Sequence, residues 1–174
     1  MGSEFLTSPF DNLLKPVDDH LIVHNELMSS LILGNKIQIH TSEHGIPDLD
    51  TTKIVIIGIP ENRNSIDYLG DELNLNEIRK SFYNLYPGNW STEIADLGNL
   101  ILGENVEQTY GRIISMLSIL FEKNIIPIII GGSHDLLYAN YRAYDSFKST
   151  VNIVNIDSNF DIGDSAKPIN NLSY

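Results

Sequence analysis

Three short runs of β-branched and aliphatic residues most constrain how this chain can fold. They span residues 53–59, 125–130 and 151–156, and Pro, Gly or Asp follows each of them. A continuous apolar run without polar alternation is typical of a strand covered on both faces, as in a parallel sheet. We therefore predict parallel strands at these three places, with a shorter strand at 93–97.

Segments with helical spacing of apolar residues separate the runs. One covers residues 71–86, and a second opens with Asn105 and Gln108 in a capping-box pattern and continues to about residue 123. Its predicted buried stripe consists of Val106, Tyr110, Ile113, Leu117 and Leu120. Residues 133–147 also have helical character. The alternation of strands and helices predicts right-handed crossovers in a three-layer α/β/α fold with a mostly parallel sheet.

The chain divides into three parts by composition. Residues 1–5 resemble a cloning remnant, and residues 6–52 form an irregular lead-in, broken by Pro and Gly, in which residues 21–33 could form the one helix. Residues 53–174 are predicted to belong to one α/β domain.

Charge and cysteine content exclude several functions. The formal net charge is -12 and there is no cysteine. An acidic chain repels nucleic acid and anionic membranes, and without thiols it has neither disulfides nor thiolate zinc sites. No apolar run approaches the roughly 20 residues of a membrane helix, and the N-terminus does not read as a signal peptide. We expect a cytoplasmic protein with no nucleic-acid or membrane partner.

Polar residues follow two of the predicted strands. Gly-Gly-Ser-His-Asp stands at 131–135 and Asp-Ser-Asn-Phe-Asp at 157–161. Ligands bind beyond the carboxyl ends of parallel strands, so His134, Asp157 and Asp161 are expected to share one crevice. One imidazole with carboxylates suits a divalent ion such as Mn²⁺.

Other interpretations of these residues stay open at this point. A His after two glycines can cap a helix, and Asp at a strand end often makes turn hydrogen bonds. The glycine pair could also bind a phosphate through backbone amides, although both nucleotide-binding glycine motifs are absent. Surface, packing or interface roles are expected for the remaining His and the clustered Tyr residues: His20, His24, His40, His44, Tyr138, Tyr141 and Tyr144.

The two strand-end motifs and three upstream segments resemble the ureohydrolases, the family of arginase, agmatinase and formimidoylglutamase. The upstream matches are Gly-Ile-Pro at 58–60, Asn-Glu-Ile-Arg at 76–79 and Asp-Leu-Gly-Asn at 96–99. Together the matches occur in the family's order and cover about residues 53 to 164. The resemblance implies an arginase-like α/β/α fold and a homo-oligomer.

The resemblance also implies a two-manganese centre that hydrolyses a C–N bond of a small guanidino or formimino compound. Carried over by position, His134 and Asp161 would each bind one Mn²⁺, and Asp157 would bridge both.

Two family positions differ in this sequence. Asn159 stands where the family has a second His ligand, and Ser133 stands where it has an Asp beside the metal site. The chain also ends at Tyr174, before the family's last carboxylate motif, so we predict an N-terminal part that is inactive alone. The alternative is a pseudoenzyme that acts as a binding or scaffold protein.

Overall fold

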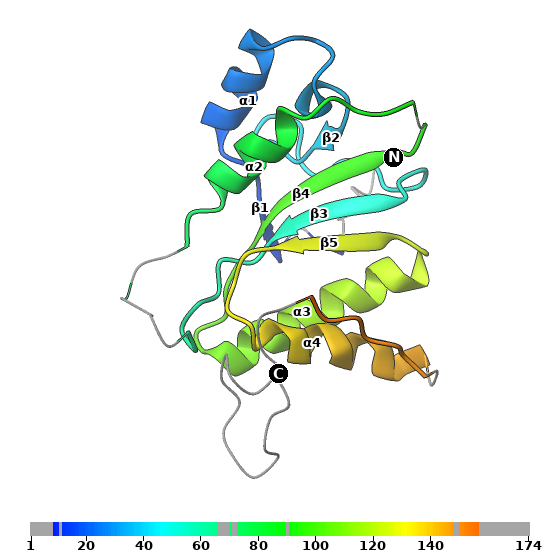
Figure 1. The fold of residues 1–174 in the computed structure, drawn as a ribbon. Helices are drawn as coiled ribbons and strands as arrows, with labels where there is room; N and C mark the ends of the chain where they lie inside the picture. Colours follow the sequence, from blue (N-terminus) through cyan, green and yellow to red (C-terminus); the bar gives the residue numbers. More distant parts are fainter. Residues whose placement is uncertain are drawn as a thin grey trace, which may run out of the picture.

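A mixed five-stranded sheet forms the centre of the protein (Figure 1). The computed structural model describes residues 9–10, 12–65, 70, 73–89, 91–147 and 150–156. The strands are β1 (Leu14–Lys15), β2 (Gln38–Ile39), β3 (Ile54–Gly58), β4 (Ile94–Leu100) and β5 (Ile126–Ile130). β3 lies between β4 and β5 and is parallel to both, while β2 runs parallel and β1 antiparallel to β4.

Helices cover both faces of this sheet. They are α1 (Asp19–Leu27), α2 (Asn76–Tyr83), α3 (Val106–Glu122) and α4 (Leu136–Ala143), with 3-10 turns at Leu33–Asn35 and Tyr144–Phe147. Figure 1 shows α1 and α2 on one side of the strands and α3 with α4 on the other. The predicted α/β/α fold with a mostly parallel sheet is therefore confirmed.

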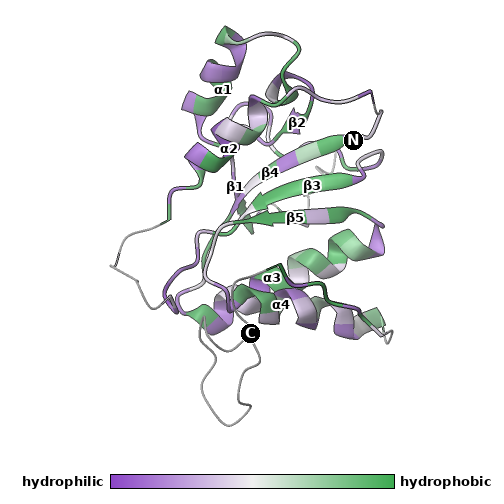
Figure 2. Cartoon of the chain, in the orientation of Figure 1, coloured by the Kyte–Doolittle hydropathy of each residue, from purple (hydrophilic) through white to green (hydrophobic). Residues whose placement is uncertain are grey.

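The main core lies between the sheet and the α3–α4 layer. The predicted stripe of α3 is buried against β3 and β4, and Figure 2 shows β3 and most of β5 as hydrophobic. The Asn105 side chain accepts a hydrogen bond from the Gln108 amide at 2.8 Å, which is the predicted helix cap. The apolar stripe and the capping pattern therefore both predicted α3 correctly.

A buried ion pair fixes α2 to the other face of the sheet. The Arg79 Nε donates to Asp96 Oδ2 at 2.9 Å, and both side chains are almost completely buried. The Tyr83 hydroxyl donates to the same oxygen at 2.7 Å, and the Gly98 amide donates to Oδ1 at 2.8 Å. Burial and the neighbouring Asp96 charge raise the pKa of Tyr83 well above its ordinary value, so its hydroxyl stays protonated.

The lead-in differs from the prediction. Helix α1 ends at Leu27 instead of continuing to residue 33, and β1 and β2 add short strands to β4. Strands of two residues contain no periodicity that a sequence pattern can detect. Among the described residues, none of the helices has the length and apolar character required to cross a membrane.

The predicted strand at 151–156 is wrong for this structure. Within the part of the chain that the structure describes, the segment has no ladder partner, and Ile153, Val154 and Ile156 are exposed to 57%, 86% and 96%. It runs beside α4 in Figure 1 instead of along the outer edge of β5. A β-branched run favours extended backbone, but a strand also needs a hydrogen-bonded neighbour, which the run itself does not specify.

Candidate functional site

The loops that follow β3, β4 and β5 meet at one end of the sheet. Because these three strands are parallel, their carboxyl ends lie on the same side. The Ser133 amide, after β5, donates to the Glu61 carbonyl, after β3, at 2.8 Å. The Arg63 Nη1 donates to the Glu104 carbonyl, after β4, at 2.8 Å. The three loops therefore form one hydrogen-bonded assembly.

Two glycines carry the chain from β5 into this assembly. Gly131 and Gly132 have φ angles of 84° and 89°, in the left-handed region that favours glycine. A Cβ on Gly132 would lie 2.0 Å from a Leu136 methyl carbon and 3.0 Å from the Ile59 carbonyl oxygen. The glycine pair is thus required both by backbone conformation and by the close approach of α4 and β3.

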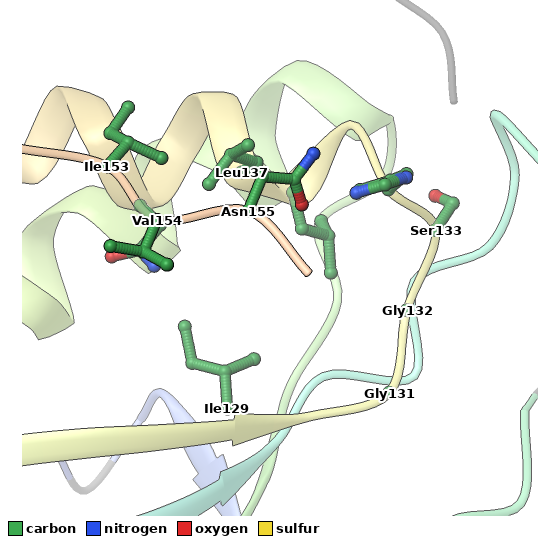
Figure 3. Close-up of a pocket in the computed structure, with 11 residues that line it drawn as sticks. Ile129, Gly131, Gly132, Ser133, Leu137, Ile153, Val154 and Asn155 are labelled. Atoms are coloured by element: carbon green, nitrogen blue, oxygen red, sulfur yellow. The ribbon is translucent and has the colours of Figure 1, made fainter. Parts of the chain in front are cut away.

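His134 lines a pocket of about 510 Å³ between β5, α4 and the segment before residue 157. Figure 3 shows Ile129 on one wall, Gly131 to Ser133 along one end, and Ile153, Val154 and Asn155 opposite. Of the three residues predicted to share this crevice, the structure describes His134. Asp157 and Asp161, with Asn159, lie outside the described residues.

The side chains at this pocket fit a divalent metal by the chemistry of their donors. His134 offers an imidazole nitrogen, and Ser133, Asn140 and Asn155 offer oxygens, with no thiolate among them. Nitrogen and oxygen donors without sulfur suit ions such as Mn²⁺. In the part of the chain that the structure describes, no three His, Asp or Glu residues gather as a complete ligand set.

A buried salt bridge beside the site was missed in the sequence. Glu61 is fully buried, and both of its carboxylate oxygens accept hydrogen bonds from the Arg63 guanidinium, at 2.9 Å and 3.2 Å from Nε. Burial alone would raise the pKa of Glu61, but the hydrogen bonds and charge of Arg63 outweigh it and hold that pKa below its ordinary value. Its position directly after the Gly-Ile-Pro strand end was the available signal.

Asp135 is a second buried carboxylate that the sequence did not single out. Its Oδ2 accepts hydrogen bonds from the Tyr110 hydroxyl and, at 3.2 Å, from Asn64 Nδ2. Within the described residues its Oδ1 has no hydrogen-bond partner. Although Asp135 stands directly before α4, its side chain accepts no hydrogen bond from that helix.

The other residues considered in the sequence have packing or surface roles here. His40 is buried, and its Nδ1 lies 2.9 Å from the Leu97 carbonyl. Tyr138 packs edge-on against Tyr110, and the Tyr144 ring lies against Phe121.

The structure is that of an open α/β protein with a pocket beyond the carboxyl end of β5, where such folds commonly bind ligands. The chain belongs to the arginase family, because the model of that family matches residues 52–173. The resemblance seen in the strand-end motifs is thereby confirmed.

Curated relatives include two bacterial formimidoylglutamases. The protein of Macrococcus caseolyticus is 29% identical over 103 residues, which cover 56% of this chain and 32% of the relative. That of Halalkalibacterium halodurans is 26% identical over 117 residues, or 62% of this chain and 37% of the relative. The chain thus spans about a third of the length of these relatives.

Solved structures share the fold. The formiminoglutamase of Trypanosoma cruzi, determined with Mn²⁺, has a TM-score of 0.64 at 20% identity, covering 82% of this chain and 50% of that one. The formimidoylglutamase of Bacillus subtilis has a TM-score of 0.64 at 15% identity, covering 99% of this chain and 50% of that one. At such identities the likeness concerns the fold alone.

Proposed function

We propose that this chain supplies part of the active site of a Mn²⁺-dependent ureohydrolase, with His134, Asp157 and Asp161 as its metal ligands. The observation that carries the proposal is the pocket of His134. Residues 153–155 line the same pocket, and Asp157 follows only two residues later in the chain. A divalent cation held there supplies Lewis-acid chemistry at neutral pH.

The helix layer beside β5 supports this arrangement. The crossover from β4 to β5 passes through α3, and α4 packs beside α3 on the same face of the sheet. Residues 153–155 follow α4 in the chain and line the His134 pocket together with Ile129 of β5.

The substrate class is proposed as a small formimino or guanidino compound, with the formimino group first. The curated relatives with similar sequences include formimidoylglutamases. The pocket walls made by Ile129, Leu137 and Val154 are apolar.

A second candidate function is binding without catalysis. Asn159 is at a family ligand position, where a neutral amide is a poor substitute for imidazole, and Ser133 replaces an Asp. The Ser133 hydroxyl donates only weakly, at 3.4 Å, to the Glu61 carbonyl. These substitutions favour a protein that retains the fold and binds a ligand or partner.

Turnover assays distinguish the two candidates. We expect the full-length protein, loaded with Mn²⁺, to hydrolyse N-formimino-L-glutamate faster than L-arginine or agmatine. Chelation should abolish the activity and added Mn²⁺ should restore it. Absence of turnover on all three compounds would reject the enzyme, and recovery of turnover in Asn159→His would attribute the loss to that ligand position.

A further inference from the structure

The peptide that carries His134 is clamped between two buried anchors. On one side, the Ser133 amide donates to the Glu61 carbonyl at 2.8 Å. On the other side, the Asp135 carboxylate is completely buried and accepts a hydrogen bond from the Tyr110 hydroxyl. His134 itself is only half-buried and faces the pocket. The neighbours of His134, rather than its own burial, therefore hold its backbone.

Asp135 does not have the usual role of an Asp before a helix. Such residues normally accept hydrogen bonds from amides of the first helical turn. The Asp135 side chain accepts none, and it instead contacts Tyr110 on α3 and Asn64 in the loop after β3. The side chain thus connects the His134 loop to two other elements instead of stabilising α4.

The cost of burying Asp135 also points away from a purely stabilising role. Its Oδ1 has no hydrogen-bond partner in the described chain, and a buried polar atom left in that state costs about 1–3 kcal/mol. No salt bridge to Asp135 occurs among the described residues, whereas the buried Glu61 and Asp96 each bind an arginine. A polar group kept under these conditions calls for a further explanation.

We propose that Asp135 and Tyr110 are positioning residues that hold the loop of His134 in the orientation for metal binding. The metal-binding part of this inference rests on the proposed function, whereas the fixing of the loop does not. Substituting a residue that orients the metal ligands without binding the metal typically lowers metal affinity 10- to 100-fold. The Tyr110 hydroxyl is the contact to remove, because its ring also packs on Tyr138 and Phe retains that packing.

The experiment compares Tyr110→Phe with Tyr83→Phe in the full-length protein. Both changes delete a buried hydroxyl that donates to a buried carboxylate, but Tyr83 acts on Asp96, on the opposite face of the sheet. Hydrogen exchange of the Ser133 amide, without metal, reports on the loop, and Mn²⁺ titration reports on the site. We expect Tyr110→Phe to speed that exchange and to weaken Mn²⁺ binding, each about tenfold relative to Tyr83→Phe.

Equal exchange of the Ser133 amide in the two variants would overturn the inference, whatever the metal result. If the unmodified protein binds no Mn²⁺, the proposed function fails, and the exchange measurement alone still decides whether Tyr110 fixes the loop. Should Tyr110→Phe not fold, Asn64→Ala removes the other donor to Asp135, and the same faster exchange is expected.

Discussion

Two buried carboxylates on opposite faces of the sheet are held in different ways. Asp96 accepts hydrogen bonds from Arg79, Tyr83 and the Gly98 amide, so both of its oxygens are satisfied. Asp135 has two neutral donors on one oxygen and none on the other within the described residues. The first environment is complete without any ligand. The second is adjacent to a pocket and to His134.

The difference separates residues that specify the fold from residues that prepare a site. Around Asp96, a buried charge is fully paired, and removing its partner should cost stability without affecting the pocket. Around Asp135, the contacts join the loop after β5 to the loop after β3 and to α3, at the end of the sheet where α/β proteins bind ligands. Variants at matched positions in the two regions should therefore differ in whether they affect stability alone or Mn²⁺ binding as well.

The largest effect is expected from Arg79→Ala. The substitution leaves the buried Asp96 without its cation, which typically costs about 3–5 kcal/mol. Urea unfolding measures the loss, and Lys80→Ala, at an exposed neighbouring position, should change stability by less than about 0.5 kcal/mol. A loss below about 1 kcal/mol for Arg79→Ala would show that the ion pair is not needed for the fold.

Replacing one glycine in each of the two regions by Ala should have an intermediate effect on stability. Gly98 and Gly132 have φ angles of 80° and 89°, and an added Cβ would lie 2.0 Å from Lys15 O and from a Leu136 methyl carbon, respectively. Each change to Ala should cost about 1–3 kcal/mol, because the backbone conformation is unfavourable for Ala. Only Gly132→Ala should also weaken Mn²⁺ binding, as measured by titration of the folded protein. Equal affinities in the two variants would contradict the division into regions.

Glu61→Gln tests the salt bridge between Glu61 and Arg63 through the pH dependence of stability. Since the folded pKa of Glu61 lies below the unfolded value of 4.5, its ionised form stabilises the fold above that value, and this contribution is lost as pH falls through the folded pKa. The free energy of unfolding of the variant at pH 7 should be about 1–3 kcal/mol lower than that of the unmodified protein. The difference in stability from the unmodified protein should narrow as the pH falls below 4.5 and through the folded pKa of Glu61. A difference independent of pH would mean that the charge of Glu61 does not stabilise the fold.

Much of the fold could be predicted because its signals are local. The apolar runs of β3 and β5 and the Asn105 cap of α3 each depend on neighbouring residues. Residues 151–156 have a similar pattern but form no strand here, because pairing depends on a distant partner.

The site was predictable only in part for the same reason. His134 follows a strand and a glycine pair, which is a local signal. The contacts of Asp135 with Tyr110 and Asn64 join residues 25 and 71 positions apart in the sequence. No spacing rule in a single sequence detects such pairs.

Manganese titration of the full-length protein tests the central claim most directly, with His134→Ala compared to His20→Ala. His20 is exposed on α1, far in sequence from the pocket-lining residues. The account predicts that the protein binds Mn²⁺, that His134→Ala lowers the affinity at least about tenfold, and that His20→Ala leaves it unchanged. Absence of Mn²⁺ binding, or equal affinity in the two variants, would contradict a metal site at the end of β5.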